Sequence, residues 1–235
     1  MRGIVNCMKH GSEIFVSEVT SFMNQILLEA PEQLETERLM LRAPRFGDGA
    51  MVNSAIRESL AFLGKWMGWA DHIPEIEETE ANVRRHRVNF LLREAFTFYM
   101  LDKASQDFIG TCSLVRIDWH VRRLEIGYWI GQSASGNGYM TEAVNEVTRF
   151  AFTYLQANRV EIRCDTRNTA SRGVAERCGY HLEGIFVNNF IDPYGSLRDD
   201  CIYAKVRLQD GTCGHPSQIS SMDSSCMSGE RREDV

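Results

Sequence analysis

Residues 123–142 read RLEIGYWIGQSASGNGYMTE, and this stretch carries the strongest signal for the fold. Its first half is an apolar run typical of a buried strand, and its end opens a segment with helical periodicity from Thr141 to about Leu155. A second strand-like run, RVEIRCD at 159–165, follows this helix. A strand, a helix and another strand in this order form a crossover, so we expect the two strands to run parallel.

The segments before this crossover predict an antiparallel meander. AFTFYMLD at 95–102, FIGTCSLVRID at 108–118 and RLEIGYWIG at 123–131 are strand-like runs joined by short polar connections. Parallel neighbours would need a connection of roughly a dozen residues or more, so neighbouring runs are expected to pair antiparallel.

The other segments complete one domain of the α/β (α+β) class at 34–208. Its expected elements are a strand at 34–44, helices from Asp48 and over 77–94, an aromatic-rich loop at 59–76, a short helix at 168–180 capped by Asn168 or Ser171, and a hairpin at 182–208. We therefore expect a mixed, mostly antiparallel twisted sheet with about four helices. Residues 1–33 are expected to be an extension with one helix, and residues 209–235 a disordered tail.

The composition excludes several classes of protein. The net charge is −6 and the pI is about 5.6, whereas phosphate binding by nucleic-acid proteins requires clustered positive charge. No stretch approaches the roughly 20 consecutive apolar residues of a membrane span. The seven cysteines form no C-x-x-C pair, so neither a metal site nor a disulfide framework is expected. The prediction is a cytoplasmic protein, monomeric or homodimeric, with no nucleic-acid, membrane or metal partner.

Gly136 and Gly138 stand between the strand and the helix, and two interpretations of this loop are open. It is either an ordinary tight turn or an anion site, because a helix N-terminus exposes unpaired N–H groups and glycine lets a ligand approach the backbone. The sequence lacks the Lys-Ser or Lys-Thr of a Walker loop. Thr141 occupies the position at which a dinucleotide-binding loop needs a third small residue.

Four stretches together resemble the GCN5-related N-acetyltransferases, and within them the RimJ/RimL branch that acetylates protein N-termini. They are LETERLMLRAP at 34–44, ESLAFLGKWMGWA at 58–70, EIGYWIGQSASGNGYMTEAV at 125–144, and NTASRGVAERCGY at 168–180 followed by LEGIF. The resemblance covers residues 34–208. It implies acetyl-CoA as co-substrate, with the pyrophosphate on the glycine loop and the pantetheine between two splayed parallel strands.

The resemblance also assigns residues to acetyl-CoA. They are Trp129 and Ile130 on the strand, Ser135, Gly136, Asn137, Gly138, Tyr139, Met140 and Thr141 in the loop, and Asn168 after the second parallel strand. Ser135 departs from the Gln or Arg usual at the first loop position, and Met140 replaces a common Gly or Ala. Both departures leave the backbone amides in place.

Acetyl transfer from a thioester to an amine needs a neutral amine, a stabilised oxyanion and a proton for the leaving thiolate. The family often uses a Tyr as the acid, but the matching position here is Ala175. The resemblance instead points to Ser171 in an N-x-x-S arrangement, with a helix cap as its alternative role. Glu125 is the candidate base, and a salt bridge with Arg122 or Arg123 is the alternative for this residue.

Trp66 and Trp69 are candidates for the acceptor groove, although two buried anchors of a long loop would give the same pattern. The first hypothesis is transfer of acetyl from acetyl-CoA to the α-amine of a protein N-terminus of the ribosomal-protein class. The alternatives are acetylation of a small amine, such as an antibiotic or metabolite, and a non-catalytic acyl-CoA-binding module.

Overall fold

The order of strands in the sheet follows the order of strands in the sequence, with one exchange at the end. The computed structural model describes residues 24–192, 195–208 and 211–214. Its strands are β1 Gln33–Glu35, β2 Leu39–Arg42, β3 Phe96–Asp102, β4 Phe108–Asp118, β5 Arg123–Ile130, β6 Arg159–Asp165, β7 His181–Ile191, β8 Leu197–Arg207 and β9 Cys213–Gly214. Its helices are α1 Gly49–Leu63, α2 Ile76–Leu92, α3 Tyr139–Thr153 and α4 Thr169–Arg177, with short 3-10 helices η1 Gln25–Leu27 and η2 Gln132–Ala134.

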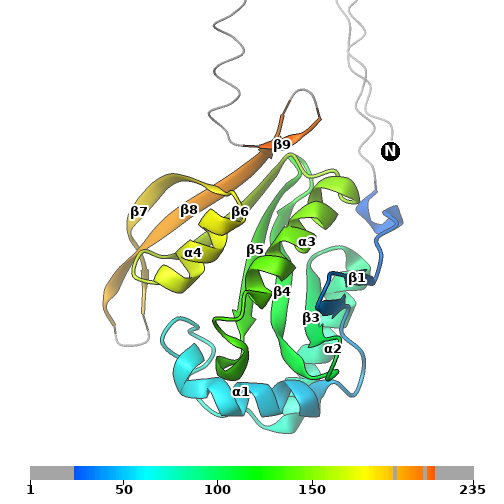
Figure 1. Cartoon of the computed structure of the whole chain (residues 1–235), viewed down its shortest axis with the longest axis vertical. Coiled ribbons are helices and arrows are strands. Elements are labelled where there is room, and N and C mark those ends of the chain that lie inside the picture. Colours follow the sequence, from blue (N-terminus) through cyan, green and yellow to red (C-terminus); the bar gives the residue numbers. More distant parts are fainter. Residues whose placement is uncertain (1–23, 193–194, 209–210, 215–235) are drawn as a thin grey trace, which may run out of the picture.

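The sheet is open and mixed, in the order β1-β2-β3-β4-β5-β6-β8-β7, and β9 pairs with β8 (Figure 1). Strands β3, β4 and β5 form the predicted antiparallel meander. The chain then crosses over through α3, so β5 and β6 run parallel, as the pattern at 123–165 predicts. The hairpin of β7 and β8 returns with β8 next to β6. The predicted fold class is confirmed.

The main core lies between the sheet and α3 and α4. Helix α3 buries one stripe of side chains, which includes Val144, Val147 and Phe150, against apolar residues of β2–β6. Burying an aliphatic side chain of this size stabilises the fold by roughly 1.5–3 kcal/mol. A second cluster, containing Val52, Val83 and others, packs α1 and α2 against the opposite face of β3 and β4. Both faces of the first half of the sheet are therefore covered, and helix cover on the second half is on one face.

Two boundaries differ from the sequence-based expectation. Helix α1 continues to Leu63, into the segment expected to be a loop, because Ile56, Ser59 and Leu63 keep a helical spacing of buried positions. Cys213 and Gly214, in the expected tail, form β9 on the edge of β8. The helix expected in the N-terminal extension lies almost wholly outside the described residues. None of the helices that the structure describes is long and apolar enough to cross a membrane.

Candidate active site

The parallel strands β5 and β6 separate part of the way along their length. They pair from Arg123 and Arg159 as far as Ile126 and Ile162, and the pairing then stops. Strand β5 nevertheless continues to Ile130 and stays paired with β4 throughout. The main-chain groups of residues 127–130 that point toward β6 are therefore free for a ligand, and the opening connects the two faces of the sheet.

The glycine loop ends at this opening, on the face that carries α3 and α4. Gly136 and Gly138 have φ values of 82° and 81°, in the left-handed region that favours glycine. The first hydrogen bond of α3 runs from the Glu142 N–H to the Gly138 carbonyl at 3.1 Å. The N–H groups of residues 139–141 thus lack an intrahelical acceptor, and together with the helix dipole they form an anion-binding end.

A distant turn fixes the shape of this loop. Arg38, just before β2, donates from Nη1 to the Asn137 carbonyl at 3.0 Å and from Nε to Glu142 at 2.8 Å. The same carboxylate accepts from the Arg38 N–H at 2.9 Å and from the Thr36 hydroxyl. The Arg38 guanidinium also lies 4.4 Å from the centre of the Tyr139 ring. Arg38 neutralises a carboxylate that would otherwise repel an anion at the start of α3.

Ser171 meets a second hydroxyl at the opening. Asn168 caps α4, because its side chain accepts from the Ser171 N–H at 3.1 Å, so capping is the role of Asn168 and not of Ser171. The Ser171 hydroxyl is 2.8 Å from the hydroxyl of Tyr128 on β5, which also donates to the Ser171 carbonyl at 3.1 Å. Burial raises the pKa of Tyr128, so this phenol remains protonated. Burial also raises the pKa of the neighbouring Cys164 thiol to about 12.

Gly173 in the middle of α4 has a local structural reason. A Cβ at this position would lie 2.9 Å from Nη1 of Arg177, so the glycine leaves room for the guanidinium to lie along the helix. From there Arg177 donates through Nε to the hydroxyl of Thr141 at 3.3 Å. A cation therefore stands beside the open N-terminus of α3, between the two helices that border the loop.

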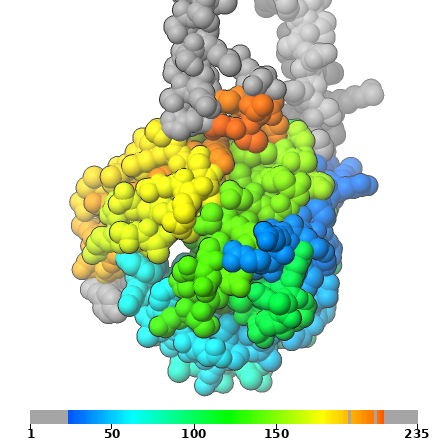
Figure 2. Space-filling model, in the orientation of Figure 1, coloured from blue at the N-terminus to red at the C-terminus, as the bar shows by residue number. Residues whose placement is uncertain are grey.

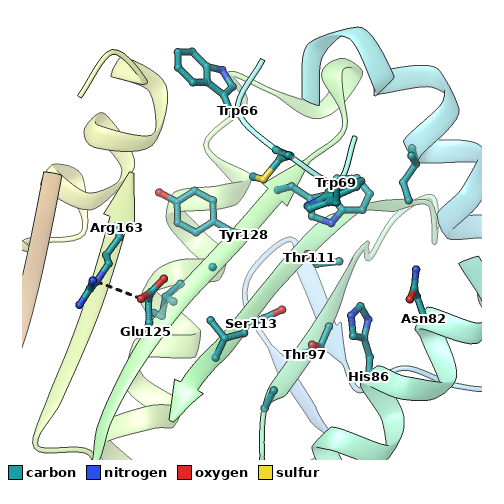
Figure 3. A pocket seen from close by; sticks show the side chains of 18 of the residues that line it. Trp66, Trp69, Asn82, His86, Thr97, Thr111, Ser113, Glu125, Tyr128 and Arg163 are labelled. Atoms are coloured by element: carbon teal, nitrogen blue, oxygen red, sulfur yellow. Dashed lines mark ion pairs between the residues drawn. The ribbon is translucent and has the colours of Figure 1, made fainter. Parts of the chain in front are cut away.

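A large cleft lies on the other face of the sheet. Its volume is about 1340 Å³, and its walls come from α1 and the segment after it, from α2, and from β3–β8 (Figure 3). Asn168 and Ser171 at the start of α4 also line it, so the cleft includes the opening between β5 and β6. Figure 2 looks onto the α3–α4 face and shows the surface hollowed where the yellow, green and cyan segments meet, on that side of the opening. Trp66 and Trp69 line the cleft and keep 36% and 47% of their surface exposed, so they are not buried anchors. Trp69 packs edge-on against Trp129 with ring centres 6.0 Å apart.

Two arginines hold Glu125 at the floor of the cleft. Nη1 of Arg116 lies 2.9 Å from both carboxylate oxygens, and Nε of Arg163 is 3.3 Å from one of them. The sequence suggests Arg122 or Arg123 as the partner, but both expectations are wrong. The side chain of Arg123 lies on the same face of β5 as Glu125 yet is paired with Asp118, and the partners of Glu125 come from the neighbouring strands.

His86 of α2 faces the cleft opposite Glu125 (Figure 3). Its Nδ1 is 3.5 Å from the hydroxyl of Tyr99, and the two rings pack edge to face. Burial, with a contribution from the charge of Arg85, lowers the pKa of His86. The imidazole is therefore neutral at pH 7 and can accept a hydrogen bond from an amine.

The structure brings most of the predicted site residues to one opening, in two groups. The loop 135–141, Asn168 and Ser171 lie on the α3–α4 side. Glu125, Trp129, Trp66 and Trp69 lie on the cleft side, and Asn168 and Ser171 also border the cleft where it reaches the opening. Two predicted residues turn away from the opening into the main core: the side chain of Met140 is 6% exposed, and Ile130 packs against the same core. These two residues can offer only their backbone groups.

Four residues that the sequence reasoning missed also contribute to this site. Tyr128, Arg38, Arg177 and His86 contact the loop, Ser171 or the cleft. Tyr128 could have been found from the sequence, because side chains alternate between the two faces of β5 and its hydroxyl is the polar group on the face that carries Leu124 and Ile126. The other three reach the site from segments with no local motif. Among the described residues, no group of three or more His, Cys, Asp or Glu side chains is arranged to hold a metal ion.

Comparison with known proteins identifies this arrangement. The model of the family described as "Acetyltransferase (GNAT) domain" matches residues 38–181, which is more than half of the chain. The chain belongs to the GNAT acetyltransferase family. An uncharacterized N-acetyltransferase, p20 of Bacillus licheniformis, is 30% identical to this GNAT protein over 180 residues, or 76% of this chain and 98% of that protein.

Two further relatives extend the comparison. The ribosomal-protein-serine acetyltransferase of Escherichia coli is 27% identical over 176 residues, covering 73% of this chain and 94% of that enzyme. A solved structure of RimL, the ribosomal L7/L12 α-N-protein acetyltransferase, in complex with coenzyme A has a TM-score of 0.70 and 23% identity. It covers 74% of this chain and 98% of that one. The family, the fold and the prediction of an acetyl-CoA-dependent N-acetyltransferase are thereby confirmed.

Proposed function

We propose that this GNAT protein transfers the acetyl group of acetyl-CoA to the α-amine at the N-terminus of a polypeptide. The size of the acceptor cleft is the observation that carries the proposal. It lies open along the sheet, and its volume of about 1340 Å³, part of which the thioester end of acetyl-CoA would fill beside Asn168 and Ser171, exceeds the roughly 300–1,000 Å³ typical of small-molecule pockets. The similarity to the ribosomal-protein-serine acetyltransferase of Escherichia coli supports the same acceptor.

The α3–α4 side suits the co-substrate. The N–H groups at the start of α3 and the guanidinium of Arg177 would hold the pyrophosphate, and the free main-chain groups of residues 127–130 would pair with the pantetheine amides. Trp129 forms the cleft wall beside this strand edge. The side-chain oxygen of Asn168 caps α4, and its side-chain NH2 group would donate to the same ligand. Bound acetyl-CoA would supply an activated thioester at the opening between the two faces.

The residues around the opening can assist transfer without a strong base. The α-amine of a polypeptide has a pKa near 7.7–8.0, compared with about 10.4 for lysine, so an appreciable fraction is already neutral at physiological pH. Glu125 is held by two guanidinium groups and would orient the amine through water or accept its proton only weakly. The neutral His86 gives the cleft a second acceptor for an amine N–H.

Ser171 would stabilise the leaving group. The sulfur of the thioester becomes negative as the carbon–sulfur bond breaks, and a hydroxyl hydrogen bond stabilises that charge. The one phenol proton of Tyr128 can be donated to the Ser171 carbonyl or to Ser171 Oγ, and in the second arrangement the serine proton is free to point into the opening. Tyr128 is then a positioning residue, and its raised pKa keeps its proton in place during the reaction.

The proposal is tested with acetyl-CoA and three matched acceptors. They are a peptide with a free N-terminus, the same peptide with a blocked N-terminus and one internal lysine, and a small polyamine. Thiol release and mass spectrometry of the products measure transfer. We expect acetylation at the α-amine of the first peptide only. Transfer to the polyamine with no reaction of either peptide would contradict the proposed acceptor and favour a small-molecule enzyme.

A further inference from the structure

The acceptor cleft adjoins a smaller cavity beyond Glu125. This cavity has a volume of about 280 Å³ and lies over the part of the sheet that no helix covers on this face. Four of its lining residues also line the main cleft, so the two spaces adjoin each other. The polar residues that line it are Arg116, Arg123, Glu125, Glu161, Arg163 and Asn189.

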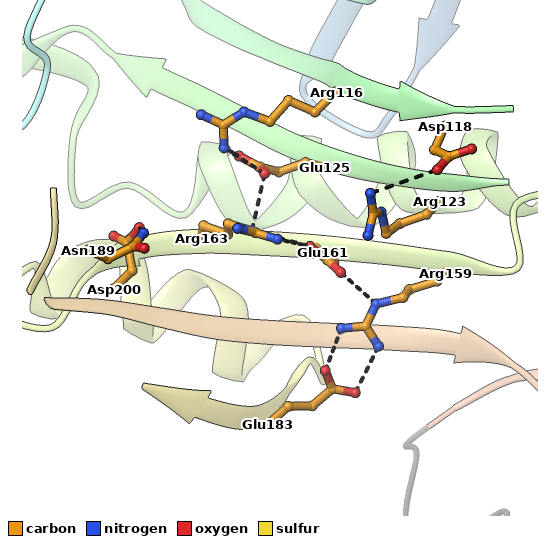
Figure 4. A network of polar contacts seen from close by, with 10 residues as sticks. All are labelled: Arg116, Asp118, Arg123, Glu125, Arg159, Glu161, Arg163, Glu183, Asn189 and Asp200. Carbon is orange, nitrogen blue, oxygen red and sulfur yellow. Dashed lines mark hydrogen bonds and ion pairs between the residues drawn. The ribbon is translucent and has the colours of Figure 1, made fainter. Parts of the chain in front are cut away.

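The charges on this face form a ladder across the strands (Figure 4). Glu125 links Arg116 to Arg163, Glu161 links Arg163 to Arg159, and Glu183 accepts both terminal nitrogens of Arg159. Figure 4 shows the alternation of guanidinium and carboxylate groups from β4 to β7. Each carboxylate in the middle of the ladder is therefore neutralised by two arginines.

The two kinds of charge differ in their access to solvent. The side chains of Glu125 and Glu161 are 12% and 6% exposed, so these carboxylates lie low against the sheet. The side chains of Arg116 and Arg123 are 71% and 47% exposed. A molecule approaching this face meets guanidinium groups first, although the three arginines and three glutamates of the ladder cancel in formal charge. We call the surface formed by Arg116, Arg123 and Arg163 the arginine face.

Two of these guanidinium groups keep donors available. A guanidinium has five N–H donors, and Arg116 directs a single nitrogen, Nη1, at both oxygens of Glu125. Within the described part of the chain, the ion pair of Arg123 is with Asp118 and spans 3.9 Å, beyond hydrogen-bond distance. Both side chains can therefore bind a carboxylate without breaking a strong contact.

The arginine face lies within reach of a polypeptide that enters the cleft. Gly127 stands where β5 leaves β6, and Glu125 and Arg123 follow at two and four residues along the same face of β5. At about 3.3 Å per residue, these positions are roughly 7 and 13 Å from the opening. An extended acceptor has the same spacing, so its third to fifth residues would lie over the arginine face when its α-amine is at the opening.

We propose that the arginine face is a binding subsite for acidic side chains at the third to fifth positions of the acceptor polypeptide. The inference rests on the proposed function and adds the chemical class of the acceptor sequence. Arg123 and Arg116 provide the charge, and the cavity beyond Glu125 provides the space. The whole chain has a net charge of −6, which would repel an acidic peptide. The attraction of acidic side chains therefore comes from the arginine face itself and not from the overall charge of the protein.

Peptides with one sequence and three charge patterns test the subsite. Each begins with the same free serine and carries Glu, Gln or Lys at positions three to five. We measure kcat/KM with wild-type protein and with Arg123→Gln and Arg123→Glu. We expect the acidic peptide to exceed the neutral one by about three- to tenfold, since exposed charge pairs contribute up to about a factor of five each. Arg123→Gln reduces this preference, Arg123→Glu reverses it, and added salt weakens it.

The controls separate the subsite from the acceptor itself. Arg149→Gln removes an equally exposed arginine from α3, on the opposite face of the sheet, and leaves the charge preference unchanged. A small amine, which cannot reach the arginine face, reacts equally with wild-type protein and both Arg123 variants. Equal kcat/KM for the three peptides would overturn the subsite but leave the proposed function standing. Reaction of the small amine with no reaction of any peptide would overturn both.

Discussion

The two sides of the β5–β6 opening are built from different kinds of group. The α3–α4 side consists mainly of backbone: the loop 135–141, the start of α3 and the unpaired edge of β5. The cleft side consists of side chains from α2, the segment after α1 and several strands, with charges and aromatic rings facing one space. A backbone site binds a constant ligand, whereas a side-chain site can change its acceptor by substitution without altering the fold.

The largest effect is expected at the residue that lies between the two sides. Ser171→Ala removes the hydroxyl beside Tyr128 and should lower kcat by at least about tenfold, because a positioned proton donor contributes roughly 10²- to 10⁴-fold in related chemistry. The KM for acetyl-CoA should change little, since the Asn168 cap uses the Ser171 N–H and not its side chain. Steady-state kinetics at saturating acceptor measure both constants.

The matched control is Ser54→Ala, which removes an exposed hydroxyl that donates a hydrogen bond to Glu58. It should leave kcat and KM at their wild-type values. If Ser171→Ala were as active as Ser54→Ala, Ser171 would have no part in the chemistry and the opening would act by positioning alone.

The next largest effect tests the backbone character of the α3–α4 side. Gly138→Ala introduces a Cβ at a φ of 81°, which costs an L-residue about 1–2 kcal/mol in this region. The loop should relax away from its binding shape, and the KM for acetyl-CoA should rise by roughly tenfold. Gly184→Ala on β7 is the control, because its φ is not positive and a Cβ there would meet open space. Unchanged affinity in Gly138→Ala would show that the side chains around the loop hold the co-substrate.

The same distinction explains which parts of the protein could be predicted from sequence. The crossover at 123–165, the meander and the final hairpin follow from local periodicity and connection length, and the glycines at 136 and 138 mark a backbone requirement. The Arg38–Glu142 and Glu125–Arg163 contacts join residues far apart in sequence. Local patterns do not contain the register of neighbouring strands or the reach of a side chain, so these partners could not be predicted.

A smaller effect is expected from the aromatic wall of the cleft. Trp69→Ala removes a half-exposed ring that packs on Trp129, and should raise the KM for a peptide acceptor by about three- to tenfold. The KM for acetyl-CoA should stay within about twofold, since the ring lies on the cleft side. Trp119→Phe is a control outside the cleft, because this indole donates to the Arg93 carbonyl at the far end of β4. Equal changes in both KM values would mean that the two sides are not separable.

The smallest effect concerns His86 on the cleft side, whose protonation makes the stability of the protein depend on pH. Burial lowers the pKa of His86 below its ordinary value of 6.5, so the unfolded chain takes up this proton at a higher pH than the folded protein does. As pH falls through about 6.5, wild-type protein therefore loses stability that His86→Gln does not lose. The drop in melting temperature between pH 7.5 and about 5.5, measured by calorimetry, should be smaller in the variant.

The control of opposite sign is His72→Gln. The hydrogen bond with Asp71 raises the pKa of His72, so the stabilisation by His72 is present at low pH and lost as pH rises. An acid-induced drop that is equal in wild-type protein and His86→Gln would mean that the imidazole is not desolvated, and the cleft would then carry a positive charge in acid beside the acceptor amine.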